Sequence, residues 1–188
     1  MLNQQFGNYK FLSVLGEGGM ATVYLAENTL LGKKVAIKLL KQEFVNNSNI
    51  RGRFLAEARH MVQVSHAHII SVLDLIDAGD IVAIVMEYVD GQSLKEYLQQ
   101  KGRLNDSEIR TLFSQILTAL QHVHDSGFVH RDIKPSNFML TRAGSIKLAD
   151  FGIAKDLNKR FEMTETGTQM GTPIYMSPEQ VRDSKDVD

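Results

Sequence analysis

The stretch that decides the fold is His130-Arg131-Asp132-Ile133-Lys134-Pro135-Ser136-Asn137, and Asp150-Phe151-Gly152 follows it along the chain. The first segment places a carboxylate (Asp132), an ammonium group (Lys134) and an amide (Asn137) close together in one loop. Asp150 precedes a flexible glycine and adds a second hard oxygen ligand, of the kind that Mg²⁺ prefers. We therefore expect a proton acceptor, a cation and metal-binding oxygens in this part of the chain.

A long amphipathic helix is predicted directly before this loop. Its apolar stripe consists of Ile109, Leu112, Phe113, Ile116, Leu117, Leu120 and Val123. Asn105, with Glu108 three residues later, is typical of a capping box, and Gly127 is a natural stop. A shorter helix is predicted over 93–99, and short strands over 138–140 and 145–148.

The first half of the chain predicts a small β-rich unit. Strand-like patterns cover 9–15, 22–27, 34–39, 69–75 and 81–89, with a turn at 77–80 between the last two. Apolar residues at helical spacing cover 50–64, after a polar segment that supplies an N-cap. We expect this β-rich lobe and the helical lobe to meet near Asp90-Gly91, with a cleft between them.

Composition excludes several classes of protein. The chain has 188 residues, no cysteine and a formal net charge of -1. At roughly 150 residues per domain it holds one domain or two small ones. Without cysteine there are no disulfides, zinc ribbons or thiol nucleophiles, which favours a reducing compartment. The near-zero charge argues against a general nucleic-acid binder, and no apolar run approaches the roughly 20 residues that span a bilayer.

The segment from Gly16 to Val23 is a glycine-rich turn between two predicted strands. Glycines let the backbone approach a phosphate and direct N–H groups at it, because no side chain blocks the approach. The plain alternative is a hairpin turn that binds nothing. A dinucleotide-binding turn is disfavoured, since it needs a helix directly after the glycines.

Lys38 ends the apolar strand segment Val35-Ala36-Ile37-Lys38, where its ammonium group reaches inward and needs an anion. Glu57, on the face of the predicted helix that carries Phe54 and Met61, is the candidate partner. Taken alone, either residue is better explained as an ordinary surface charge, and the pairing gains weight only beside the other motifs.

Two pairs of histidines, His66-Ala67-His68 and His122-Val123-His124, are candidate metal ligands. Positions i and i+2 of a helix point to different faces, which disfavours the second pair. No cysteine and no evident third ligand accompanies either pair, so we do not expect a metal site here.

Taken together, these motifs stand in the order found in protein kinases, and the sequence resembles that family over nearly the whole chain from about Tyr9. The matching segments are 16–23, 35–38, Glu57, 130–137, 150–152 and Ser177-Pro178-Glu179. The residues of these motifs are most similar to those of bacterial eukaryotic-like serine/threonine kinases.

The resemblance implies an α+β fold with two lobes. Residues 1–89 would form a nucleotide-binding lobe, with a five-stranded antiparallel sheet, one helix and a hinge at its end. Residues 90–188 would form a partial, mainly helical catalytic lobe with an activation loop over 150–179. The chain ends at Asp188, shortly after Glu179, whereas the family fold continues with several helices.

The resemblance also assigns roles to residues. Gly16, Gly18 and Gly19 would cover the phosphates of ATP, and Lys38, held by Glu57, would bind the α- and β-phosphates. Asn137 and Asp150 would hold Mg²⁺, Asp132 would accept the proton of the attacking hydroxyl, and Lys134 would stabilise the γ-phosphate. The adenine site would consist of Val14, Val23, Ala36, Leu140, the gatekeeper Met86, and the backbone of Glu87 and Val89.

Lys134 and Thr172 are similar to the serine/threonine class, so protein serine and threonine hydroxyls are the expected acceptors. Arg131 before Asp132 suggests control by phosphorylation of the activation loop, with Thr164, Thr166 and Thr168 as candidate sites. The alternative is that these threonines are ordinary polar residues.

The pattern departs from the family at Ala21, in place of the third loop glycine, and at Ser177, in place of alanine. Neither change removes a catalytic group. We therefore expect an ATP- and Mg²⁺-dependent serine/threonine kinase, or a catalytic fragment of one. We expect it to be cytoplasmic, or the cytoplasmic part of a larger membrane kinase. The alternative is a truncated kinase-like module that binds nucleotide or a partner with little phosphotransfer, and whose exposed apolar base favours self-association.

Overall fold

The computed structural model describes residues 2, 4–150 and 173–178. The chain forms two compact units. Unit 1 comprises Met1–Ser65 and Ile70–Asp90, and unit 2 comprises His66–Ile69 and Gly91–Asp188. The four residues His66–Ile69 thus pack with unit 2, although they connect two elements of unit 1 along the chain.

Unit 1 is built on a six-stranded antiparallel sheet with the strand order β1-β2-β3-β4-β6-β5. Its strands are β1 (Gln5–Phe6), β2 (Tyr9–Glu17), β3 (Ala21–Asn28), β4 (Lys33–Leu40), β5 (Val72–Ala78) and β6 (Ile81–Glu87). Phe11, Ala26, Val35, Ile37, Ala83 and Val85 form its buried core. The predicted antiparallel sheet is confirmed, and the structure adds the two-residue strand β1.

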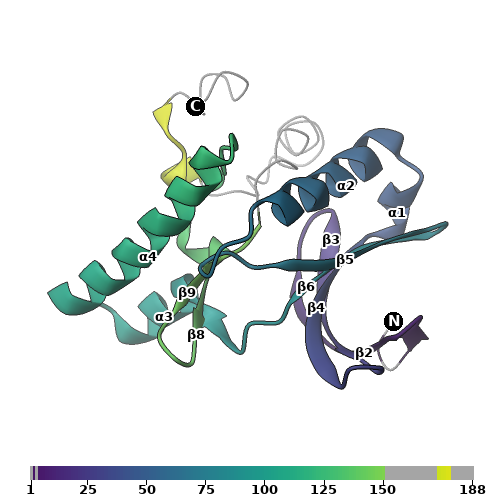
Figure 1. The fold of residues 1–188 in the computed structure, drawn as a ribbon, viewed down its shortest axis with the longest axis horizontal. Coiled ribbons are helices and arrows are strands. Elements are labelled where there is room, and N and C mark those ends of the chain that lie inside the picture. Colours follow the sequence, from purple (N-terminus) through teal and green to yellow (C-terminus); the bar gives the residue numbers. More distant parts are fainter. Residues whose placement is uncertain (1, 3, 151–172, 179–188) are drawn as a thin grey trace. The chain divides into compact units, whose positions relative to one another are not determined.

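Two helices accompany this sheet, α1 (Gln42–Val45) and α2 (Ser48–Gln63). Asn47 caps α2, because its side chain accepts hydrogen bonds from the N–H groups of Asn49 and Ile50. The buried face of α2 packs on β5 and β6, and Figure 1 shows the helix running alongside β5. The predicted helix is therefore confirmed, whereas the four-residue helix α1 was not predicted.

Unit 2 contains a second, three-stranded sheet with the order β7-β8-β9. Its strands are β7 (Gly91–Ser93), β8 (Phe138–Thr141) and β9 (Ile146–Leu148). Its helices are α3 (Leu94–Lys101), α4 (Asp106–Asp125) and the 3₁₀ turns η1 (Pro135–Asn137) and η3 (Pro173–Tyr175). The strand β7 was not predicted, and it pairs so closely with β8 that a Cβ on Gly91 would lie 2.0 Å from the carbonyl oxygen of Leu140.

Helix α4 begins with the predicted capping box, in which Asn105 and Glu108 each bind the backbone N–H group of the other. Its apolar stripe does not lie on one buried face. Leu112, Ile116, Ala119 and Val123 are buried, whereas Ile109, Phe113 and Leu117 are exposed. In the part of the chain that the structure describes, no helix is long and apolar enough to cross a membrane.

The predicted strand over 69–75 was misplaced at its start. The strand β5 begins at Val72, and Ile69 instead forms a parallel bridge with Leu148 of β9. The apolar run continues through both segments, so its pattern alone does not show where one pairing ends and the other begins. Asp77 and Ala78, which were predicted in the turn, are the last residues of β5.

Candidate active site

The glycine-rich turn joins β2 to β3 in unit 1. It is closed by a hydrogen bond from the N–H group of Gly18 to the carbonyl oxygen of Ala21, at 2.9 Å. Apart from Gly16 and its two chain neighbours, no atom of the described residues lies within 4 Å of the position that a Cβ on Gly16 would take. Packing among the described residues therefore does not require a glycine there.

Lys38 and Glu57 form an ion pair, which we call the lysine pair. The Lys38 Nζ lies 2.8 Å from the Glu57 Oε1, and the Glu57 side chain is only 1% exposed. Lys38 comes from β4, in the middle of the sheet, and Glu57 from the buried face of α2. A carboxylate that is this well buried is costly unless a cation accompanies it, so the pair fixes the position of the lysine ammonium group.

The predicted adenine-binding residues of unit 1 lie on adjacent strands. Ala36 on β4 pairs with Met86 on β6, and both side chains are buried. The N–H group of Glu87 already donates to the carbonyl oxygen of Ser71, at 2.9 Å. The N–H group of Glu87 is therefore already engaged within unit 1. Leu140, the remaining predicted wall, lies on β8 of unit 2.

Asp132, Lys134 and Asn137 meet within one loop of unit 2, and we call them the aspartate cluster. The Lys134 Nζ lies 2.9 Å from the Asp132 Oδ2. The amide nitrogen of Asn137 donates to the same carboxylate oxygen at 2.9 Å and to the Asp132 main-chain oxygen at 2.8 Å. The Asp132 side chain is 12% exposed, so the carboxylate is oriented by two neighbours and still reaches the surface.

His130 connects this loop with the residue before Asp150. Its Nδ1 accepts a hydrogen bond from the N–H group of Asp132 at 3.3 Å, and its Nε2 donates to the carbonyl oxygen of Ala149 at 3.1 Å. Because a carbonyl only accepts, the ring carries its proton on Nε2. The His130 side chain is buried in unit 2 and does not face solvent. Its two hydrogen bonds position the backbone next to it.

Asn137 and Asp150 are brought together by the backbone. The N–H group of Ala149 donates to the main-chain oxygen of Asn137 at 2.8 Å, one residue before Asp150. Since the Asn137 amide nitrogen is engaged by Asp132, its amide oxygen remains as the atom for a cation. An amide oxygen and a carboxylate are hard donors and fit Mg²⁺, which takes few protein ligands and keeps water for the rest.

Two residues of this region have left-handed backbone conformations that non-glycine residues seldom adopt. These are Arg131, with φ of 60°, and Asp150, with φ of 47°. Such conformations cost of order 1–3 kcal/mol and persist where the surrounding structure imposes them, often at functional sites. Here Arg131 directly precedes Asp132 of the aspartate cluster, and Asp150 is itself a candidate metal ligand.

Several predicted residues lie outside the described ones. These are the candidate phosphorylation sites Thr164, Thr166 and Thr168, together with Phe151, Gly152, Thr172 and Glu179.

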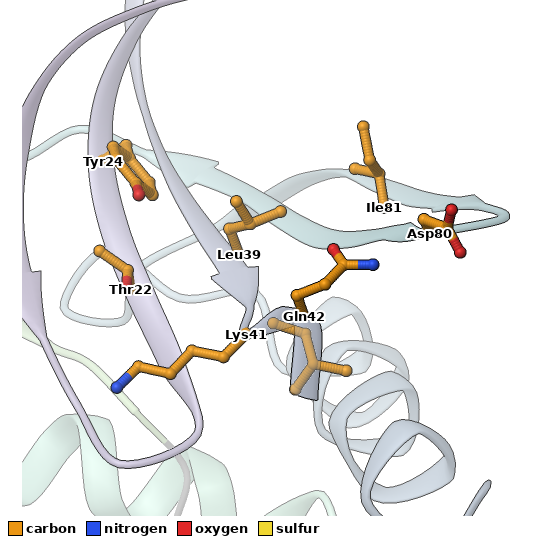
Figure 2. Close-up of a pocket in the computed structure, with 8 residues that line it drawn as sticks. Thr22, Tyr24, Leu39, Lys41, Gln42, Asp80 and Ile81 are labelled. Carbon is orange, nitrogen blue, oxygen red and sulfur yellow. The ribbon is translucent and has the colours of Figure 1, made fainter. Parts of the chain in front are cut away.

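A pocket of about 250 Å³ in unit 1 is distinct from the predicted nucleotide residues (Figure 2). Its lining consists of Thr22, Tyr24, Leu39, Leu40, Lys41, Gln42, Asp80 and Ile81. Successive side chains of a strand point to opposite faces of the sheet. The pocket residues Tyr24 and Leu39 therefore face away from Val23 and Lys38, the residues next to them in sequence.

Two side chains that hold β9 next to this site were not predicted. Gln115 of α4 accepts hydrogen bonds from Ile146 and Ser145, and the ring of His68 bonds to the carbonyl oxygen of Ile146. Gln115 stood among the polar residues of an amphipathic helix, and His68 was considered only as a metal ligand. No group of three His, Cys, Asp or Glu residues within 2, 4–150 and 173–178 is arranged to hold a metal ion.

A curled antiparallel sheet with a Lys–Glu pair, together with an Asp–Lys–Asn loop and a following aspartate, defines a protein kinase fold. A solved structure described as "PpkA-294 apo form" shares this fold, with a TM-score of 0.79 and 24% sequence identity. The match covers 88% of this chain and 66% of that one.

The family model for the protein kinase domain matches residues 9–188, so the chain belongs to the protein kinase family. It is 44% identical to the serine/threonine-protein kinase PrkC of Bacillus subtilis, over 94% of this chain and 27% of that protein. It is 41% identical to the probable serine/threonine-protein kinase PknB of Lactococcus lactis, over 94% of this chain and 28% of that protein. The chain thus spans little more than a quarter of these relatives, and the predicted resemblance to bacterial kinases is confirmed.

Proposed function

We propose that this chain transfers the γ-phosphoryl group of ATP to serine and threonine hydroxyls of proteins. The observation that carries the proposal is the geometry of the aspartate cluster. Lys134 and Asn137 fix one carboxylate oxygen of Asp132 at 2.9 Å each, in a loop that also binds the backbone beside Asp150. Kinase catalysis rests on positioning and electrostatic stabilisation, which is what such a set of residues supplies.

In the proposed reaction, Asp132 orients the acceptor hydroxyl and takes its proton. The hydroxyl oxygen forms a bond to the γ-phosphorus as the bond to the leaving ADP oxygen breaks. Lys134, 2.9 Å from the Asp132 Oδ2, also neutralises charge on the transferred group. When bound by Asn137 and Asp150, Mg²⁺ supplies further charge neutralisation on the phosphates.

The residues of unit 1 bind ATP in this proposal. The Lys38 ammonium group, held by Glu57, binds the α- and β-phosphates, and the backbone of Gly16, Gly18 and Gly19 covers the phosphates. Ala36 and Met86 contribute apolar surface for adenine, together with Val14 and Val23, and the backbones of Glu87 and Val89 supply hydrogen bonds. ATP as substrate is consistent with a cytoplasmic location, which we propose as well.

A test of the function compares transfer of labelled phosphate from ATP to a generic basic protein by three forms of the chain. Asp132→Asn removes the proton acceptor and keeps the shape. Asp125→Asn changes an exposed aspartate at the end of α4 and serves as the matched control. We expect phosphoserine and phosphothreonine from the wild type and the control only. Tight nucleotide binding without transfer by the wild type supports the alternative, a nucleotide-binding module.

We propose further that the chain phosphorylates its own loop at Thr164, Thr166 or Thr168, and that Arg131 pairs with the added phosphate. A phosphate of about -2 charge forms strong bidentate hydrogen bonds with a guanidinium group. Mass spectrometry after incubation with ATP and Mg²⁺ tests this. Phosphate between residues 152 and 171 supports the proposal, and its absence in a chain that phosphorylates other proteins contradicts it.

A further inference from the structure

Strand β9 leads directly to the candidate metal ligand Asp150. It has three residues, Ile146–Leu148, of which Ile146 and Leu148 are 0% exposed. So short a strand forms few hydrogen bonds with its neighbour β8, and its exact position depends on the groups that bind its other edge. Those groups therefore determine the position of the backbone at Ala149 and Asp150, which follow the strand.

His68 binds β9 at two points. Its ring Nδ1 lies 2.9 Å from the carbonyl oxygen of Ile146, and it donates this hydrogen bond because a carbonyl only accepts. Its main-chain oxygen accepts a hydrogen bond from the N–H group of Leu148 at 2.8 Å. One residue therefore holds both ends of the strand, from a segment 78 positions away in sequence.

Gln115 of α4 binds the same residue, Ile146, at the edge that His68 also contacts. Its Oε1 accepts from the N–H group of Ile146 at 2.7 Å and from the Ser145 hydroxyl at 3.3 Å. The N–H group and the carbonyl group of Ile146 are thus both engaged by side chains, which is unusual within a strand, where the neighbouring strand commonly supplies these partners.

His66 in turn orients His68. Its Nδ1 accepts a hydrogen bond from the main-chain N–H group of His68 at 3.1 Å. Its ring stacks on that of His122 of α4, with the ring centroids 5.1 Å apart. Burial lowers the pKa of His66, and the neighbouring His122, His68 and Lys147 lower it further, which keeps Nδ1 available as an acceptor near neutral pH.

We propose that His68 is a positioning residue for metal binding, which holds β9 so that Asp150 takes its place beside Asn137. The connection is continuous. His68 fixes Leu148, and the next residue, Ala149, donates to Asn137 and accepts from His130 before the chain reaches Asp150. The proposal rests on the proposed function of Asp150 as a Mg²⁺ ligand.

The competing explanation is that His68 has a purely structural role. A structural role and a positioning role differ in a measurable way. Loss of a structural hydrogen bond lowers the free energy of unfolding and leaves metal affinity alone. Loss of a group that orients a metal ligand weakens metal binding, typically by about 10- to 100-fold. Metal affinity, measured without any phosphotransfer, therefore separates the two explanations.

The experiment uses Mn²⁺ as the probe, in the presence of ADP, with free Mn²⁺ followed by electron paramagnetic resonance. The first pair of variants is His68→Leu, which removes the ring donor, and His68→Asn, whose Nδ2 takes the place of the ring Nδ1. We expect about 10-fold weaker Mn²⁺ binding for His68→Leu and binding within about 2-fold of the wild type for His68→Asn.

Gln115, which binds β9 through a different main-chain group of Ile146, provides a second pair of variants in case His68→Leu does not fold. Gln115→Leu removes the acceptor and Gln115→Glu keeps it, so only the first is expected to weaken Mn²⁺ binding. Amide hydrogen exchange over residues 146–150 gives an independent signal, with faster exchange expected in both leucine variants than in their partners.

Asp150→Asn separates failure of this proposal from failure of the proposed function. If it weakens Mn²⁺ binding and the folded leucine variants do not, the metal assignment stands and the positioning role is overturned. If Asp150→Asn leaves Mn²⁺ binding unchanged, the metal assignment and the positioning role are overturned together. Weaker binding in Asp150→Asn and in a folded leucine variant, restored by the matched partner, supports the proposal.

Discussion

The lysine pair and the aspartate cluster each join a lysine to a carboxylate, yet they are built in different ways. Lys38 and Glu57 come from a strand and a helix, and the Glu57 side chain is 1% exposed. Asp132 and Lys134 come from one loop, and their side chains are 12% and 31% exposed. The first pair therefore depends on tertiary packing, and loss of its lysine leaves a buried charge, whereas the second lies nearer to water.

Removal of one partner from the lysine pair is expected to have the largest effect on stability. Lys38→Met leaves the buried Glu57 carboxylate without the Lys38 ammonium group, and loss of one partner of a buried ion pair costs about 3–5 kcal/mol. Chemical denaturation of the chain measures this loss in the free energy of unfolding.

The double variant Lys38→Met/Glu57→Gln is the control, because it removes the buried charge together with its counterion. We expect it to be more stable than Lys38→Met alone. Equal free energies of unfolding for the two variants would show that the charge of Glu57 is not what destabilises the single one.

A backbone contact in unit 2 gives the next largest effect. In Gly91→Ala the new Cβ would lie 2.0 Å from the Leu140 carbonyl oxygen, so β7 and β8 must separate, at a cost of about 1–3 kcal/mol. Gly52→Ala, in α2 of unit 1, is the matched control. Apart from its chain neighbours and the backbone of its own helix, no described atom lies within 4 Å of its Cβ position, and alanine is expected to stabilise the helix by about 0.5–1 kcal/mol. Thermal unfolding of both variants is the test, with a lower Tm expected for Gly91→Ala and a higher Tm for Gly52→Ala.

Removal of the lysine from the aspartate cluster is expected to change the free energy of unfolding less than the substitutions above. Lys134→Met breaks a partly exposed ion pair, and such pairs contribute about 0–1 kcal/mol. Its effect on the proposed reaction is large by comparison, about 100-fold in kcat, because it removes a cation from the transferred phosphoryl group. A loss of stability as large as that in Lys38→Met would remove the distinction between the two regions.

The smallest effect is the pH dependence of unit 2. The folded protein lowers the pKa of His66 below its usual 6.5, first through burial and then through His122, His68 and Lys147. As pH falls below 6.5, the unfolded chain binds a proton that folded His66 resists, so the free energy of unfolding decreases until pH passes the folded pKa. His66→Asn keeps an acceptor for the His68 N–H group and is expected to remove this part of the slope. Urea unfolding between pH 7.5 and 5 measures it, and an unchanged slope in the variant contradicts the assignment.

The sequence predicted best what is local in the chain. The aspartate cluster lies within six consecutive residues, and the capping box at Asn105 within four, so their residue types and spacing already indicate the contacts. The lysine pair was predicted as well, because a lysine in an apolar strand and a glutamate on the apolar face of a helix each need a partner.

Contacts between distant segments were not predicted. His68 binds a carbonyl group 78 positions away, and its ring was considered only as a metal ligand, a role that the lack of a third ligand disfavoured. The start of β5 was misplaced for a related reason, because Ile69 is as apolar as the strand that follows but pairs with Leu148. Hydrophobic patterns show that a residue is buried, and they do not show which distant backbone it meets.

The central claim is that Asp132 is the proton acceptor of a phosphotransfer reaction. The most direct measurement is the rate of phosphate transfer from γ-labelled ATP by the wild type and by Asp132→Asn, with the dissociation constant of ATP determined on the same samples. We expect a rate at least about 100-fold lower in the variant, with ATP affinity within about 2-fold. Equal rates in the two proteins would contradict it.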